Sequence, residues 1–246
     1  MYYFASDIHL GAGSVAEQRA TERLFVEWLE RVSADATAIF LCGDIFDFWF
    51  EYQRVVPRGF VRTLSKISEL TERGVKVLFM AGNHDMWVRD YLTVECGVEI
   101  YTAPTTFTLG AKKVHVAHGD NLNIKGNFKL KLMNSFFRSK LARALFSTLV
   151  HPDLALKFGQ WWSASSRKKH SVETPELRYR LLSYLRDYAV DHHQEHHDDI
   201  YIFGHLHYVE AYDKEQPQIF FMNDWSSDPH YLALSEDGKA ELRRVK

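Results

Sequence analysis

Five short polar clusters each follow directly on an apolar, strand-like run of the chain. They combine Asp, Asn and His side chains, a mixture of oxygen and nitrogen ligands that suits divalent transition ions. Open α/β sheets build their sites beyond the carboxyl ends of strands, so we expect the five clusters to meet there. The clusters are Asp7-Ile8-His9, Gly43-Asp44 with Asp47, Gly82-Asn83-His84-Asp85, His118-Gly119-Asp120 and Gly204-His205-Leu206-His207.

The spacing within these clusters indicates a two-metal centre. One residue separates Asp7 from His9 and His205 from His207, so in extended backbone each pair turns to the same side. Asp44 follows a glycine at the end of an apolar run, a suitable position for a carboxylate that bridges two ions roughly 3.5–4 Å apart. We therefore predict a two-metal phosphoesterase. The expected metal ligands are Asp7, His9, Asp44, Asn83, His118, His205 and His207.

Strand and helix patterns alternate in the first part of the chain and antiparallel strands dominate the last part. This order predicts an α/β protein with two packed sheets flanked by helices. The expected early elements are strands at Tyr2–Ser6, Ala36–Cys42 and Val75–Ala81, helices at Ala16–Ser33, Arg58–Arg73 and Met86–Glu95, and a hairpin of Thr105–Leu109 with Lys112–Ala117. The expected late elements are a helix at Glu176–His193 and strands at Asp199–Phe203, Val209–Asp213, Gln218–Met222, Tyr231–Ser235 and Ala240–Val245.

The 246 residues suit one domain, spanning 1–246, with an inserted segment at about 122–175. Cys42 and Cys96 fit neither a disulfide framework nor a zinc-ligand spacing, which favours an intracellular protein. We expect no signal peptide, because Asp7 follows almost at once on Met1. Since no apolar run approaches the roughly 18 residues that span a bilayer, we expect any membrane contact to be peripheral.

The inserted segment is basic and rich in bulky apolar residues. Between Lys125 and Lys169 it holds ten Lys and Arg residues and one acidic residue, whereas the whole chain carries a net charge of −2. A basic helix with a bulky apolar face is typical of elements that bind lipid or an anionic membrane surface. The alternative is a helical hairpin whose Leu and Phe side chains pack on the core.

The ordered set of five clusters resembles the calcineurin-like metallophosphoesterase family. The resemblance implies a four-layer α/β/β/α sandwich of two mixed sheets with a helical lid insertion, and two divalent ions, often Mn²⁺. It places His84 as a catalytic residue at the scissile phosphoryl group, with Asp47 as its orienting partner. It assigns Asp7, His9, Asp44 and His207 to one ion, and Asp44, Asn83, His118 and His205 to the other.

Within the family the chain resembles the branch that hydrolyses UDP-2,3-diacylglucosamine to UMP and 2,3-diacylglucosamine 1-phosphate in lipid A biosynthesis. That branch implies substrate contacts by Asn83, His84, Ser166 and Arg167, with acyl chains held by the insertion. His84 stands where many of its members carry Arg, and Asp47 where they carry Glu; His170 and Glu173 also differ from the usual Asn and Lys. The similar segments are Ser6–Leu10, Gly43–Trp49, His118–Asp120, Ala164–Arg167, Gly204–His207 and Trp225.

The implied partners are a lipid-linked nucleotide and the anionic inner membrane, with the protein cytoplasmic and peripheral on the cytoplasmic face. We expect no nucleic-acid partner, and the sequence gives no sign of an obligate protein partner. Two alternatives use the same fold: a nuclease or phosphodiesterase acting on another nucleotide, which would grip phosphates with the basic segment, and a non-enzymatic scaffold, which should have lost ligands. Four further histidines, His192, His193, His196 and His197, are expected to form a solvated helix end.

Overall fold

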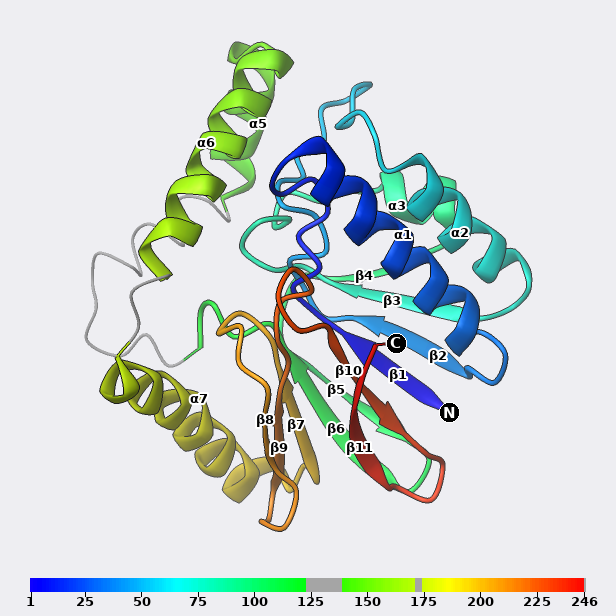
Figure 1. Ribbon diagram of the computed structural model, residues 1–246, viewed down its shortest axis with the longest axis vertical. Coiled ribbons are helices and arrows are strands. Elements are labelled where there is room, and N and C mark those ends of the chain that lie inside the picture. The colour runs from blue at the N-terminus through cyan, green and yellow to red at the C-terminus, as the bar shows by residue number, and fades with distance from the viewer. Residues whose placement is uncertain (123–138, 171–173, 246) are drawn as a thin grey trace.

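The computed structural model describes residues 1–122, 139–170 and 174–245 and contains two mixed β-sheets (Figure 1). The six-stranded sheet has the strand order β11-β10-β1-β2-β3-β4, in which β1 to β4 run parallel and β10 is antiparallel to both of its neighbours, β1 and β11. Its strands are β1 (Tyr2–Ala5), β2 (Ala38–Leu41), β3 (Lys76–Met80), β4 (Glu99–Tyr101), β10 (His230–Leu234) and β11 (Ala240–Arg244).

The five-stranded sheet has the order β5-β6-β7-β9-β8. Its centre is parallel, because β6 and β9 both pair in parallel with β7, and the predicted hairpin of β5 and β6 is confirmed as an antiparallel pair. Its strands are β5 (Thr105–Leu109), β6 (Lys112–Ala117), β7 (Ile200–Phe203), β8 (Glu210–Tyr212) and β9 (Gln218–Phe221).

Helices cover the outer faces of both sheets and complete the predicted α/β/β/α sandwich. Alternation along β1 shows the layering: Tyr3 and Ala5 pack under the first helices, whereas Tyr2 and Phe4 face the other sheet. A third apolar cluster joins the five-stranded sheet to its covering helix. The helices are α1 (Val15–Val32), α2 (Val61–Glu72) and α3 (Tyr91–Cys96) on the six-stranded sheet, and α7 (Pro175–His196) on the five-stranded sheet.

The predicted helix at Met86–Glu95 is wrong in its first half. The backbone of residues 86–90 instead pairs with the loop after Asp47, through a bridge between Phe50 and Trp87. The buried carboxylate of Glu51 accepts hydrogen bonds from the backbone amides of Asp90 and Tyr91, and α3 begins only there. These contacts join segments about 40 residues apart, so the local helical pattern does not reveal them.

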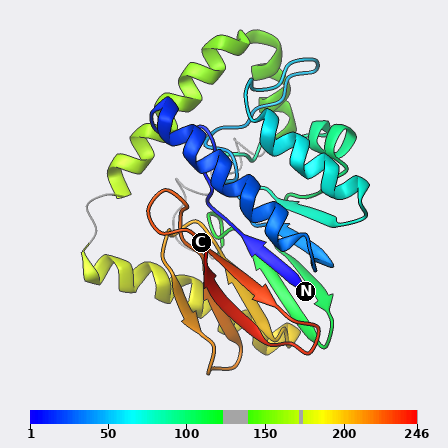
Figure 2. The same cartoon turned by 45° about the vertical axis from the view of Figure 1, so that its right-hand side comes forward.

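Two helices of the insertion, α5 (Lys140–Leu149) and α6 (Pro152–His170), lie outside both sheets, on the side toward which β1 runs (Figures 1 and 2). Phe146 of α5 packs on the rings of Phe50 and Trp87. The hydroxyl of Tyr52 also donates to the carbonyl of Val150, at 2.9 Å. The described part of the insertion thus docks on the loops that follow β2 and β3. Among the described residues, no helix is both long and apolar enough to cross a membrane.

Candidate metal centre

The loops that follow the strands hold the expected ligands in an unusual backbone conformation. Seven described non-glycine residues have φ between +49° and +67°, a region that side chains disfavour. Five of the seven are expected ligands: Asp7, His9, Asp44, His205 and His207. The spacing predicted that the paired ligands converge through extended backbone, and this prediction is wrong. These five ligands have a left-handed backbone themselves, a strained conformation that tends to occur at functional sites.

Two motif glycines allow the loops to approach one another closely. A Cβ atom at Gly82 would collide with the carboxylate of Asp44, and one at Gly204 would collide with Ser6 and Asp7. Any side chain at either position would push a carboxylate out of the centre. The glycines of the Gly82 and Gly204 motifs are thus required by packing between loops rather than by the local turn alone.

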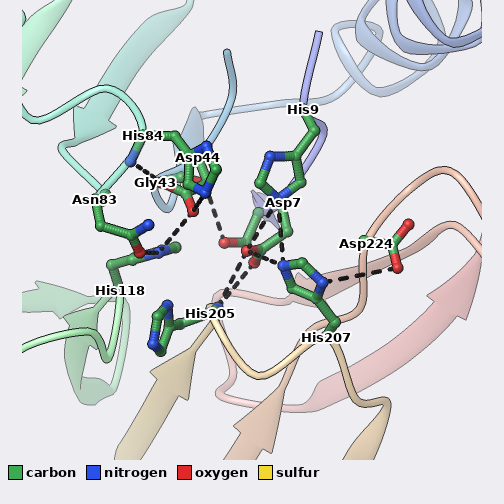
Figure 3. A network of polar contacts seen from close by, with 12 residues as sticks. Asp7, His9, Gly43, Asp44, Asn83, His84, His118, His205, His207 and Asp224 are labelled. Carbon is green, nitrogen blue, oxygen red and sulfur yellow. Dashed lines mark hydrogen bonds and ion pairs between the residues drawn. The ribbon is translucent and has the colours of Figure 1, made fainter. Parts of the chain in front are cut away.

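One group of ligands forms around the buried carboxylate of Asp7 (Figure 3). Its Oδ1 atom lies 3.2 Å from His207 Nε2 and 3.8 Å from His9 Nε2. The same carboxylate accepts a hydrogen bond from the backbone amide of His205, which fixes the loop after β7 against the loop after β1. Asp224, which the sequence analysis did not identify, lies 3.9 Å from His207 Nδ1.

A second group forms around Asp44 and contains His118 and His205. Asp44 Oδ2 lies 3.2 Å from His118 Nε2, and Asn83 Oδ1 lies 3.2 Å from the same nitrogen. His118 Nδ1 donates to the carbonyl of Cys42 at 3.1 Å, which leaves Nε2 facing the centre. Asp44 also shares a group with His9 and His84, so the two sets of ligands adjoin.

His84 lies at the edge of both groups. Its backbone amide donates to Asp44 Oδ1 at 2.8 Å, and its Nδ1 donates to the backbone carbonyl of Asp47 at 2.7 Å. The carboxylate of Asp47 is farther from that nitrogen, at 4.0 Å, and closer to His9 Nδ1, at 3.6 Å. Asp47 therefore orients His84 through its main chain, and the Nε2 atom of His84 is directed toward Asp44.

The chemistry of these residues fits two divalent ions. Two carboxylates and four imidazoles would not pack together in a protein interior without cations to compensate them. His9 Nε2 and His207 Nε2 lie only 3.2 Å apart. This close approach of two ring nitrogens matches ligands arranged for a metal rather than for each other.

The electrostatics of the centre favour ionised carboxylates. Burial alone would raise the pKa of Asp7, but the hydrogen bond and charge of His207 and the charge of His118 outweigh it and lower that pKa to about 2. Burial also opposes ionisation of Asp44, yet His118 and His84 hold its pKa well below the usual range. Burial and the neighbouring His118 lower the pKa of His205 to about 4, which keeps this imidazole neutral. Burial opposes protonation of His118 and His207, yet Asp44 raises the pKa of His118 and Asp7 raises that of His207, so both imidazoles would release a proton when an ion binds.

Asp85 connects the two loops that carry Asp44 and Asn83. It is fully buried and accepts four backbone N–H groups, from Gly82 at 2.7 Å, Ile45 at 2.8 Å, Asp44 at 3.3 Å and Phe46 at 3.4 Å. It directly precedes the predicted helix at Met86–Glu95 but is not a helix N-cap, because α3 begins six residues later. Its four partners are instead backbone amides of the two loops.

The insertion contributes one buried polar contact that sequence reasoning missed. Ser163 of α6 donates to Asp47 Oδ1 at 2.6 Å and is buried. One turn earlier, Gly159 lies so close to the ring of Phe48 that a Cβ atom there would collide with it. The lid helix thus touches the loop that orients His84. Ser166 and Arg167, the expected substrate contacts, lie in α6, but their side chains fall outside the described part.

The fold and the centre together define a metallophosphoesterase. The family model for calcineurin-like phosphoesterases matches residues 2–209, and the chain belongs to this family. It is 37% identical over 236 residues to a protein of Porphyromonas gingivalis named UDP-2,3-diacylglucosamine hydrolase, with 91% of this chain and 89% of that protein covered. Proteins of the same name from Histophilus somni and Haemophilus influenzae are 26% and 24% identical, and each match covers 96% or more of both chains.

Proposed function

We propose that this protein hydrolyses the pyrophosphate bond of UDP-2,3-diacylglucosamine, giving UMP and 2,3-diacylglucosamine 1-phosphate in lipid A biosynthesis. The observation that carries the proposal is the pair of adjoining Asp/His groups in a chain that matches relatives of that name along nearly its whole length. We treat residues 1–246 as one domain, with the segment at about 122–175 as its lid.

The proposed ligands divide around Asp44. Asp7, His9, Asp44 and His207 would hold one ion, and Asp44, Asn83, His118 and His205 the other, with Mn²⁺ as the proposed metal. Bound ions of this kind neutralise phosphoryl oxygens and supply a water nucleophile at neutral pH. The chain holds both carboxylates in place for this task, because Asp44 accepts from the amide of His84 and Asp7 from that of His205.

His84 and Asn83 are the proposed contacts to the phosphoryl group. With Nδ1–H committed to the Asp47 carbonyl, His84 in its protonated form also carries a proton on Nε2, at the edge of the centre. That proton can be donated to a phosphoryl oxygen or to the leaving oxygen, a step typically worth about 10²–10⁴-fold in rate. Ser166 and Arg167 are proposed to contact the substrate from α6.

The lid carries an apolar surface suited to acyl chains. Leu141, Leu145 and Leu149 recur every fourth residue along α5 and are exposed by 70%, 52% and 77%. Leu154, Phe158, Trp161 and Trp162 extend this exposed apolar set along α6. A soluble protein seldom leaves such a set uncovered without a ligand or a surface to bind. We propose that it holds the acyl chains and, with the basic residues of the insertion, contacts the anionic cytoplasmic face of the inner membrane.

A lid variant tests this proposal. Leu141→Asn combined with Leu145→Asn should greatly reduce hydrolysis of UDP-2,3-diacylglucosamine, because each buried CH₂ of an acyl chain contributes about 0.8 kcal/mol to binding. Hydrolysis of a small chromogenic phosphodiester by the same variant should stay near the wild-type rate. The matched control is Val61→Asn, which changes an equally exposed apolar residue on α2.

Equal losses on both substrates, in a variant that still folds, would mean that the lid shapes the metal centre itself. No loss on either substrate would contradict the proposed acyl-binding role. The membrane contact is tested separately, by co-sedimentation with vesicles that contain anionic lipid: the proposal predicts binding that high salt weakens.

A further inference from the structure

A second group of imidazole and carboxylate side chains lies between the five-stranded sheet and the last turns of α7. His115 projects from β6 toward α7, since its neighbours Val114 and Val116 face the other sheet. Asp198 lies just before β7, and His192 comes from α7. His115 and Asp198 are buried and His192 is partly buried. None of the three belongs to the ligand groups that contain Asp7 or Asp44.

The expected solvated helix end is confirmed for His196 and His197, which are exposed, and is wrong for His192 and His193, which are partly buried. The ring of His192 packs against that of His115, with centroids 4.4 Å apart. His115 lies 77 positions earlier in the chain, so no local pattern around the four helix-end histidines could reveal this contact.

The donor atoms of this group have the spacing of metal ligands. Asp198 Oδ2 lies 3.6 Å from His115 Nδ1 and 3.5 Å from His192 Nδ1, and the three ligand atoms lie within 4.8 Å of one another. Tetrahedral zinc with Zn–N bonds of 2.0–2.1 Å places its ligands about 3.3–3.5 Å apart. In the metal centre, the corresponding Asp–His distances run from 3.2 to 3.8 Å.

The surroundings also suit a metal ligand set. The Tyr188 hydroxyl lies 3.2 Å from His115 Nε2 and would accept an N–H there once an ion takes the place of the proton on Nδ1. Thr106 Oγ1 donates to Asp198 Oδ2 at 2.8 Å and so supports the carboxylate. Burial, together with the nearby His192, lowers the pKa of His115 to about 4, and burial also lowers that of His192. Both imidazoles are therefore neutral at neutral pH, as metal ligands must be.

The fourth position faces solvent. His196 lies one turn after His192 on α7, with the two rings 4.1 Å apart, and can supply a fourth nitrogen. The hydroxyl groups of Thr106 and Tyr201 lie 2.9 Å from His115 Nδ1 and His192 Nδ1. A bound ion would replace these hydroxyls as the partner of each nitrogen.

We propose that His115, His192 and Asp198 form a third divalent-metal site, of the zinc type, which ties the C-terminal end of α7 to β6 and β7. Two neutral imidazoles and one carboxylate are ligands that Zn²⁺ accepts, with His196 or water completing the tetrahedron. The inference goes beyond the proposed function, because the site lies outside the hydrolytic centre and has no part in the reaction.

Metal counting tests this proposal. The full chain is stripped with a chelator, loaded with excess Zn²⁺, desalted and analysed for zinc per chain by mass spectrometry. We expect three ions in the wild type and two in His192→Ala. The matched control is His197→Asn, which removes an exposed imidazole one residue beyond α7 and should keep three ions. Asn is suited to that position because it tolerates the left-handed φ of 56° found there.

Zinc should also raise the thermal unfolding temperature more in the wild type than in His192→Ala. Two ions in the wild type, or three retained in a folded His192→Ala, would overturn the proposal and leave the group as a hydrogen-bonded network. If His192→Ala does not fold, His192→Gln gives the same test, because it keeps a polar side chain of similar size. Activity is not the readout, so absence of hydrolysis in every variant would count against the proposed function alone.

Discussion

Replacing Asp85 by Asn should disrupt the metal centre without removing any ligand. Asp85 Oδ1 accepts from Gly82 and Asp44, and Oδ2 accepts from Ile45 and Phe46. Asparagine keeps one oxygen and directs an NH₂ group at amides that are themselves donors. Burial and the charge of Asp44 raise the pKa of Asp85 to about 7, so the comparison is made above that pH, where Asp85 is ionised. There the variant loses at least one hydrogen bond to a charged group, about 1.5–3 kcal/mol, and leaves a buried N–H unpaired, about 1–3 kcal/mol. We expect a total loss of about 2.5–6 kcal/mol in the free energy of unfolding.

Urea denaturation gives this loss directly, and metal analysis of the folded variant shows whether the loops still hold ions. We expect metal content to fall together with stability, because Asp85 fixes the backbone of both Gly82 and Asp44. Asp90→Asn is the matched control: Asp90 is exposed, lies in the same segment and makes no side-chain cap bond, so its change should stay within about 0.5 kcal/mol. Wild-type stability and full metal content in Asp85→Asn would refute the reasoning.

Three further outcomes follow from the site. His84→Ala should keep both ions and lose about 10²–10⁴-fold in kcat, because it acts on the phosphoryl group; loss of metal in that variant would make it a ligand instead. Ser163→Ala should speed hydrogen exchange in α6 and lower kcat with metal content unchanged, since it removes the 2.6 Å bond to Asp47; unchanged exchange would show that α6 is held elsewhere. Chelation should lower the unfolding temperature and Mn²⁺ should restore it, because Asp7 and Asp44 are buried together; an unchanged temperature would contradict the fit to cations.

Much of the ligand set could be predicted from the sequence because the ligands lie in the short segments that directly follow strands. An apolar run identifies the strand, and the sheet then brings the strand ends together, so Asp7, Asp44 and His118 meet without any knowledge of loop geometry. The layered fold was predictable because strands that are apolar on both faces must be covered on both faces. In β1 and β2, alternate residues face a helix layer and the other sheet, and both strands are apolar on both faces.

Contacts between distant loops could not be predicted in this way. The sequence around Asp85 predicts a residue that caps a helix, yet its partners include amides about 40 residues earlier in the chain. Nothing in the sequence around Ser163 distinguishes it from other serines in helices, because its partner Asp47 lies 116 residues away. The left-handed turns at Asp7 and His205 have no residue-type signal, because glycine is the usual residue there. Such features depend on how loops pack, which periodicity does not encode.

The most direct test of the account is a product assay with the metal-loaded wild-type protein. UDP-2,3-diacylglucosamine and UDP-glucosamine without acyl chains are compared at equal concentration with Mn²⁺, and the products are identified by mass spectrometry. The account predicts UMP and 2,3-diacylglucosamine 1-phosphate from the acylated nucleotide, with a much lower kcat/KM for the nucleotide that lacks acyl chains. No UMP from the acylated nucleotide, with both ions bound, would contradict it.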